Sequence, residues 1–141
     1  MQHEITIPAK KENMPVVTDF LTSHLENAGV AVKQIYAINT AADEIFSNIA
    51  KYAYPHDTGD VMIRLETDTD GVQVTFTDEG EPFDPLEMPE PDITLSAQDR
   101  EIGGLGILMV KKLMDETVYS YENGKNILTV LKKTITENKR E

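Results

Sequence analysis

Hydrophobic and polar residues alternate along several short segments of the chain. In one of them Val61, Ile63 and Leu65 fall on one side and polar residues on the other. Because successive side chains of a strand point to opposite faces, this pattern is typical of a half-buried strand. The alternation predicts strands at residues 3–8, 60–67, 72–76, 117–121 and 126–132. The turn pairs Asp70-Gly71 and Asn123-Gly124 separate the last four into two antiparallel hairpins.

Other segments repeat their apolar residues every three or four positions, which predicts helices. The clearest spans residues 32–54 and is followed by Pro55. Its apolar stripe consists of Ile35, Ile38, Ala42, Ile45, Ile49 and Tyr52. A shorter helix is predicted at residues 13–28, and residues 105–114 are apolar on almost every side, as in a largely buried helix.

The order of elements predicts the fold class. A strand, two helices, a hairpin, a helix and a second hairpin cannot form an all-parallel sheet, because hairpins pair antiparallel strands. We therefore expect one domain over residues 1–141 with a two-layer α/β (α+β) sandwich: a mixed, mostly antiparallel sheet with helices on one face. The proline-rich segment at about 82–102 has no sustained period and predicts a lid loop, and the polar tail from about 134 is expected to fray.

Charge and composition exclude several classes of partner. The chain has 141 residues, with 25 Asp and Glu against 13 Lys and Arg, and a formal net charge of −12. Such a charge repels phosphate backbones and anionic lipid surfaces, so no nucleic-acid or membrane partner is expected. The absence of cysteine excludes disulfides and thiolate chemistry, and no apolar run is long enough to cross a bilayer. A cytoplasmic protein is the expectation.

The long predicted helix carries a polar row beside its apolar stripe. Glu44, Asn48 and Lys51 stand at i, i+4 and i+7 and share one face at the rim of the core. A carboxylate, an amide and an ammonium in one line could serve as a general base, a metal ligand and a phosphate contact. The same row could equally be a solvated helix face joined by hydrogen bonds.

Two further features point to a ligand. Alternation places Asp78 on the inward face of its strand, where a carboxylate is costly unless a hydrogen bond satisfies it. A ligand amino group would satisfy it, or Asp78 could cap the turn that leads to Gly80. The second feature is Gly103-Gly104-Leu105-Gly106, which opens the last helix. Glycines there could let phosphate reach backbone N–H groups, or could allow a close helix–sheet contact.

Together these motifs resemble those of the GHKL ATPases, which have the Bergerat fold. The resemblance covers about residues 35–132 and lies in Glu44-x-x-x-Asn48-x-x-Lys51-Tyr52, Asp78-Glu79-Gly80-Glu81-Pro82-Phe83, a lid, and the glycine motif. It implies ATP and Mg²⁺ as cofactors. Asn48 would bind Mg²⁺, Asp78 would accept the adenine amino group, and Glu44 would be the general base.

The resemblance also implies roles for the remaining motif residues. Gly80 would permit the turn below the base, Lys51 would face phosphate, and Tyr52 would line the nucleotide pocket. The triphosphate would meet the glycine motif, including Gly103, Gly104, Leu105 and Gly106, with Arg100 at the hinge of the lid.

Within that superfamily the sequence resembles the branch of anti-sigma regulatory factors. The chain is short and has Glu44 where histidine-kinase domains usually have Asn, and none of its three histidines lies in a phospho-acceptor motif. The branch implies a kinase that phosphorylates a serine or threonine of a small antagonist protein and sequesters a partner such as a sigma factor. A homodimer is compatible with it. The alternatives are a nucleotide-dependent partner-switching module without catalysis, and a detached histidine-kinase catalytic domain.

Overall fold

The computed structural model describes residues 1–87 and 102–134, with side chains from residue 106 onward in the second range. The elements are β1 (Gln2–Pro8), α1 (Met14–Asn27), α2 (Val32–Tyr52), β2 (Asp60–Thr67), β3 (Gly71–Asp78), α3 (Ile102–Leu113), β4 (Glu116–Glu122) and β5 (Lys125–Lys133). Two short 3₁₀ turns, η1 (Lys11–Asn13) and η2 (Pro85–Glu87), precede α1 and follow β3.

The five described strands form one sheet in the order β1-β2-β3-β5-β4. Each neighbouring pair is antiparallel, so within the described chain the sheet contains no parallel pairing. Both predicted hairpins are present, and Asn123 and Gly124 turn the second one with φ angles of 54° and 77°. Such positive φ values at both central residues match the right-handed twist of the flanking strands.

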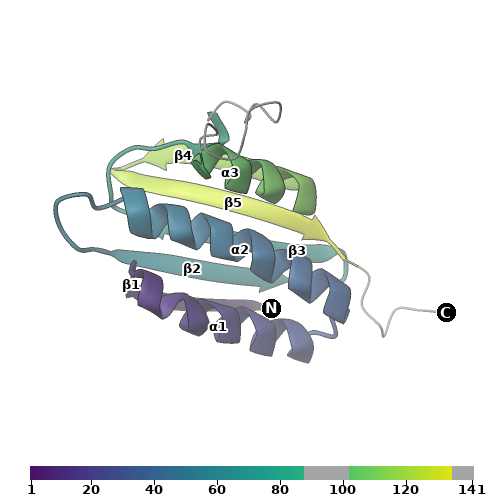
Figure 1. Ribbon diagram of the computed structural model, residues 1–141. Coiled ribbons are helices and arrows are strands. Elements are labelled where there is room, and N and C mark those ends of the chain that lie inside the picture. The colour runs from purple at the N-terminus through teal and green to yellow at the C-terminus, as the bar shows by residue number, and fades with distance from the viewer. Residues whose placement is uncertain (88–101, 135–141) are drawn as a thin grey trace.

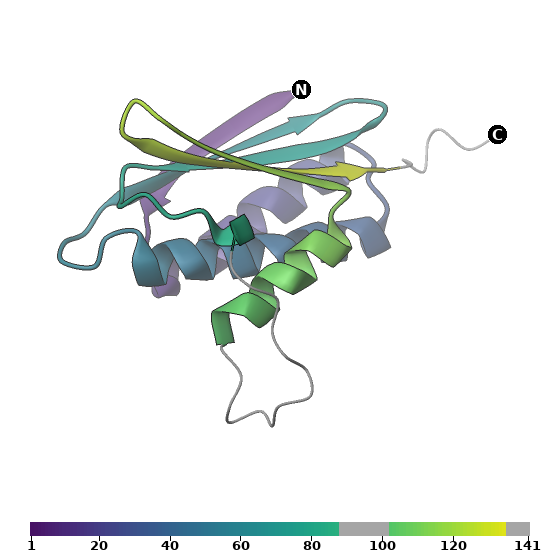
Figure 2. The same ribbon diagram turned by 90° about the horizontal axis from the view of Figure 1, so that it is seen from above.

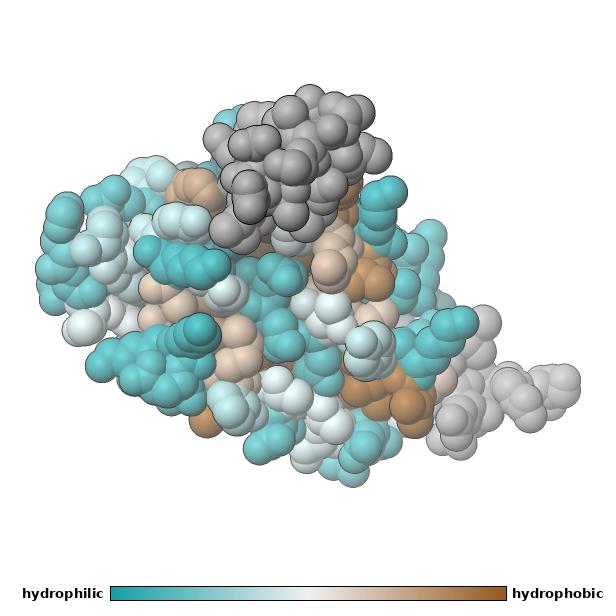
Figure 3. All heavy atoms as spheres, viewed as in Figure 1, coloured by the Kyte–Doolittle hydropathy of each residue, from teal (hydrophilic) through white to brown (hydrophobic). Residues whose placement is uncertain are grey.

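The helices cover one face of the sheet, which confirms the predicted two-layer sandwich (Figures 1 and 2). The helix α2 lies in the middle, with α1 on one side and α3 on the other (Figure 1). The outer surface of this layer is mostly hydrophilic, with hydrophobic residues scattered among the polar ones (Figure 3). The apolar side chains of the three helices are therefore directed mainly at the sheet and at one another.

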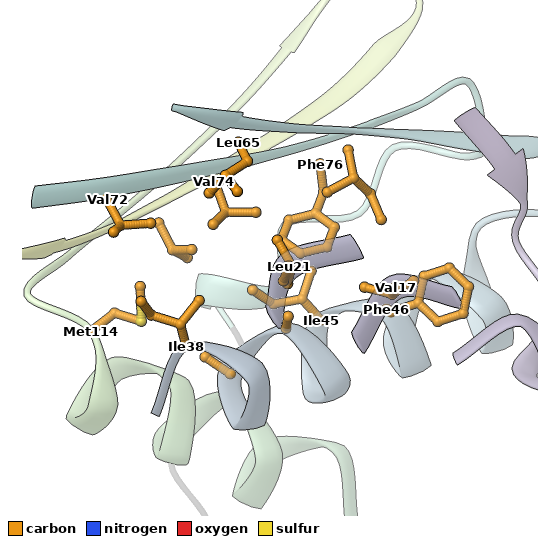
Figure 4. Close-up of a cluster of buried hydrophobic side chains, with 14 of the residues drawn as sticks. Val17, Leu21, Ile38, Ile45, Phe46, Leu65, Val72, Val74, Phe76 and Met114 are labelled. Carbon is orange, nitrogen blue, oxygen red and sulfur yellow. The ribbon is translucent and has the colours of Figure 1, made fainter. Parts of the chain in front are cut away.

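The core fills the space between α2 and the inward side chains of the sheet (Figure 4). Val61, Ile63 and Leu65 of β2 are fully buried, as their alternation predicts. Phe46 of α2 and Phe76 of β3 are the largest buried side chains. Burial of such a side chain stabilises the fold by about 1.5–3 kcal/mol. This packing sets the distance between α2 and β3, the two elements that carry the predicted site.

The predicted boundaries differ from the structure mainly where a tertiary contact ends an element. The helix α2 ends at Tyr52 rather than at residue 54. The reason is that two hydrogen bonds hold the Tyr54 side chain outside the helix. Its hydroxyl donates to the Asp60 carbonyl (2.7 Å) and accepts from the Glu79 N–H (2.9 Å). At the C-terminal end Thr134 is buried and its N–H donates to the Asp70 carbonyl (3.3 Å), so fraying is not correct for this residue. The rest of the predicted tail, and residues 88–101 of the predicted lid, lie outside the described residues.

The contact between α1 and α2 contains polar groups as well as apolar ones. The Asn39 amide donates to the Thr22 hydroxyl (2.9 Å). The Oδ1 atoms of Asn39 and Asp43, four residues apart on α2, are buried and have no hydrogen-bond partner. Burial raises the pKa of Asp43, and the charge of Glu44 raises it further by a smaller amount. A hydrogen bond from Thr18 lowers this pKa, but by less. A charged Asp43 therefore destabilises the contact between α1 and α2.

We predict that Asp43→Asn stabilises the protein at neutral pH. A raised pKa in the folded state means that Asp43 favours folding while protonated and loses that contribution as pH rises through the folded-state pKa. The amide keeps an acceptor for Thr18 and carries no charge. In urea unfolding between pH 4 and pH 7, the stability gained by Asp43→Asn over the wild type should grow with pH. A gain that stays constant over this range would contradict the assignment.

Candidate active site

The helix α2 brings the predicted base and metal ligand to the edge of the core. Asn48 is only 8% exposed, so it is buried rather than open to solvent. It lines a pocket together with residues of β3, β5 and the loop after β3, which helical periodicity alone does not reveal. The side-chain nitrogen of Asn48 has no hydrogen-bond partner. A buried polar group without a partner is costly and is available to a ligand.

Asp78 lies at the end of β3 with its carboxylate directed inward, and it is 5% exposed. Its Oδ1 accepts hydrogen bonds from the Gly80 N–H (2.9 Å) and the Asn126 amide (3.0 Å). Asp78 therefore faces the core, as the alternation predicts, and it also caps the turn to Gly80. No described residue donates a hydrogen bond to its second oxygen, Oδ2.

Asn126, on β5 opposite Asp78, connects the carboxylate to the loop that follows β3. Its amide nitrogen donates to Asp78 and to the carbonyl of Glu81 (2.9 Å), with a longer contact to the Gly80 carbonyl (3.4 Å). Its oxygen accepts hydrogen bonds from the Phe83 N–H (3.1 Å) and from the Tyr119 hydroxyl. The buried amide thus uses both ends to fix the geometry around Asp78.

A pocket opens where these elements meet. Ile45 and Ile49 of α2 and Phe76 and Leu128 of the sheet form an apolar part of its wall. The polar wall consists of Asn48, Asp78, Glu81, Tyr119 and Asn126. An apolar slot with a few fixed polar groups is typical of a site for a flat, partly polar ligand.

The turn after β3 packs directly against the end of α2. The Glu81 N–H donates to the Ala53 carbonyl (2.9 Å). At Gly80 a Cβ atom would lie 2.2 Å from that same carbonyl oxygen, so any larger residue would force the turn away from the helix. Gly80 therefore permits the turn, as predicted, through close approach of two backbones.

The other predicted site residues do not all lie in this pocket. Lys51 and Tyr52 are exposed on the last turn of α2, and neither lines this pocket, although the Tyr52 ring lies 5.6 Å from that of Phe83. Gly103, Gly104 and Leu105 belong to the first turn of α3, for which no side chains are described, and Arg100 lies outside the described residues. Gly106 faces the carboxylate of Glu44.

The described residues also limit the metal chemistry of this protein. They contain no group of three His, Asp or Glu side chains arranged to hold a metal ion. A divalent cation here would need ligands from a bound molecule, such as phosphate oxygens, beside the Asn48 amide. Among the described helices, none is both long and apolar enough to cross a membrane.

Comparison with known families decides the assignment. The family model for the histidine kinase-like ATPase domain matches residues 7–132. The chain belongs to this family. The match covers both layers of the fold, all the described pocket residues and the last helix, so the site lies in the part of the chain that the family shares.

Relatives of this ATPase domain are serine-protein kinases named RsbW. The one from Listeria monocytogenes serotype 4a is 28% identical over 148 residues, which covers 100% of this chain and 93% of the relative. The one from Bacillus cereus strain AH187 is 26% identical over 129 residues, covering 89% and 81% respectively. The one from Staphylococcus aureus strain JH9 is 28% identical over 131 residues, covering 88% and 82%.

A solved structure supports the fold. The crystal structure of the RsbU and RsbW domains of a Mycobacterium tuberculosis protein matches with a TM-score of 0.69 at 18% identity. The match covers 95% of this chain but 32% of that longer chain, so this ATPase domain spans about a third of it.

The sequence patterns do not single out Asn126 or Tyr119, and Phe83 stands in the quoted motif without an assigned role. For Asn126 a signal existed, because it alternates with Leu128 and Val130 on the inward face of β5. An inward polar residue is the same signal that identified Asp78. The contact of Phe83 with Asn126 depends on how the loop folds back, which no periodic pattern reports.

We predict that Asn126→Ala destabilises this ATPase domain by about 1–3 kcal/mol, because the buried Asp78 carboxylate loses one of its two hydrogen bonds and the loop at Glu81 loses its bond to β5. Lys125→Ala, at the exposed start of the same strand, is the matched control and should change stability by less than about 0.5 kcal/mol. The measurement is the free energy of unfolding in urea. Equal effects of the two substitutions would show that the Asn126 hydrogen bonds contribute little.

Proposed function

We propose that this protein is an ATP-dependent protein serine/threonine kinase of the anti-sigma-factor type. The observation that carries the proposal is the arrangement around the pocket. A buried carboxylate, Asp78, has one oxygen fixed by Asn126 and Gly80, and it lies in the same pocket as the unpartnered amide of Asn48. One turn before Asn48, α2 carries Glu44. The names of the relatives support kinase activity.

Adenine recognition is proposed for Asp78. Because its Oδ1 accepts two hydrogen bonds, the carboxylate is held in one orientation and Oδ2 is left for the exocyclic amino group of adenine. Hydrogen bonds to a charged acceptor are about twice as strong as neutral ones. The apolar walls formed by Ile45, Ile49 and Phe76 would contact the faces of the base.

The phosphates are proposed to lie between Asn48 and the first turn of α3. When bound, Mg²⁺ would neutralise charge on the phosphates, with Asn48 as its protein ligand. The ligand atom would be the Asn48 Oδ1, and the buried Nδ2, which has no described hydrogen-bond partner, could donate to a phosphate oxygen. Lys51, Tyr52, Arg100, Gly103, Gly104 and Leu105 are proposed to complete the nucleotide site, and Gly106 lies beside Glu44. Backbone N–H groups at a helix N-terminus suit phosphate oxygens.

Glu44 is proposed as the general base. It would take the proton from the hydroxyl of the substrate residue while that oxygen attacks the γ-phosphorus. The bond to the bridging oxygen of ADP then breaks, and ADP leaves. Positioning and charge neutralisation carry most of the catalysis in phosphoryl transfer, so the base contributes one part of it.

The proposed partners are proteins. They are a small antagonist that carries the phosphorylated serine or threonine and an effector that the kinase sequesters, such as a sigma factor. We propose that the protein acts in the cytoplasm and forms a homodimer. The net charge of −12 is consistent with protein rather than nucleic-acid partners.

Asp78→Asn should weaken ATP binding with little loss of stability. The amide keeps the size of the side chain and its contact with Gly80, but it loses the charge that accepts the adenine amino group. Isothermal titration should show Kd rising about 10–100-fold, the equivalent of 1.5–3 kcal/mol. GTP, which lacks the exocyclic amino group at that position, serves as the reference ligand. Loss of folding without ligand would instead mean that Asp78 acts mainly as the cap of the turn.

Glu44→Gln separates binding from chemistry. The amide has the same shape but cannot accept the proton, so ATP affinity should change little while transfer falls about 10²–10⁴-fold. The assay is incubation with γ-labelled ATP and the antagonist protein encoded beside this gene, followed by identification of the phosphorylated residue. Binding without transfer by the wild type would favour a partner-switching module. Phosphohistidine on the acceptor would favour the detached histidine-kinase domain.

A further inference from the structure

Gly106 and Glu44 meet across the contact between α3 and α2. A Cβ atom built on Gly106 would lie 2.3 Å from Oε2 of Glu44, 3.1 Å from its Cδ and 3.7 Å from its Cγ. The distances increase from the tip of the side chain toward the backbone. The carboxylate therefore occupies the space that a side chain at position 106 would fill.

The rest of this helix contact does not require a glycine. Ile107 and Val110 of α3, and Met114 directly after it, are buried and hold the helix in the layer. Among the described residues, the three atoms nearest to a methyl group at position 106 all belong to the flexible side chain of Glu44, so the backbones of α2 and α3 need not separate. The change of lowest energy that makes room for this methyl group is rotation of the Glu44 side chain away from position 106, with the fold retained.

We propose that Gly106 is a positioning residue for Glu44. Because Gly106 has no side chain, the Glu44 carboxylate can lie against its backbone. This contact sets the position of the proposed base relative to Asn48. This inference rests on the proposed function of Glu44, and it differs from the role of phosphate contact that the glycine motif suggests. A general base must lie within about 2.6–3.2 Å of the proton that it takes, and a displacement of about 1 Å can cost roughly 100-fold in rate.

The first test is Gly106→Ala. Alanine is the better helix former, so Tm should stay the same or rise. Kd for ATP should stay within about twofold of the wild type, while transfer of the γ-phosphoryl group should fall at least tenfold. Met109→Ala, on the exposed side of the same helix, is the matched control and should alter none of the three quantities.

The second test is a cycle with Glu44→Gln. If Gly106 acts through the carboxylate, the double variant Gly106→Ala/Glu44→Gln should transfer phosphoryl groups at the rate of Glu44→Gln alone. A further tenfold fall in the double variant would overturn the proposal, because Gly106 would then act independently of the base. A tenfold or greater rise in Kd for ATP in Gly106→Ala would also overturn it, in favour of direct contact with phosphate.

A crystal structure of Gly106→Ala tests the geometry without any assay of activity. The expected result is an unchanged backbone with the Glu44 side chain in a different rotamer. A carboxylate that stays in place would overturn the proposal. If the wild type transfers no phosphoryl group, the proposed function fails. If the wild type transfers and Gly106→Ala matches it, only the role of Gly106 fails.

Discussion

Burial of the Asp78 carboxylate at the end of the apolar inward row of β3 is the constraint on which the site depends. The inward residues before it on β3, Val72, Val74 and Phe76, pack into the core. A carboxylate in the same row needs hydrogen bonds to offset its loss of hydration. Asn126 and the turn at Gly80 supply them, and this requirement places both the partner strand and the following loop.

The same constraint determines the shape of the pocket. The amide nitrogen of Asn126 donates to Asp78 and to the Glu81 carbonyl, and its oxygen accepts from the Phe83 N–H. The same side chain therefore holds both the carboxylate and the loop. That loop is also tied to the end of α2 by the hydrogen bond from Glu81 to Ala53. A network of buried and part-buried hydrogen bonds thus forms the polar side of the pocket, and the low dielectric around the Asp78–Asn126 bond strengthens it.

The helix layer supplies the complementary half of the site. Because α2 is held between α1 and α3 and against the sheet, packing sets where its backbone lies (Figure 1). This helix carries Asn48, whose buried Nδ2 has no described partner, and Glu44, whose carboxylate lies beside Gly106. The proposed adenine-binding group on the sheet and the proposed base on the helix therefore belong to two layers that the core joins.

The sequence by itself determined the secondary structure, the fold class and the inward direction of Asp78, because each follows from a short-range period of 2 or about 3.6 residues. The resemblance to the GHKL motifs also predicted that Glu44, Asn48 and Gly80 belong to one site. Only the tertiary structure decided that Asn48 is buried, that Asn126 holds Asp78, and that Gly106 meets Glu44. These are contacts between elements far apart in the chain, and they depend on the distance and angle at which packed layers meet, which no local pattern encodes.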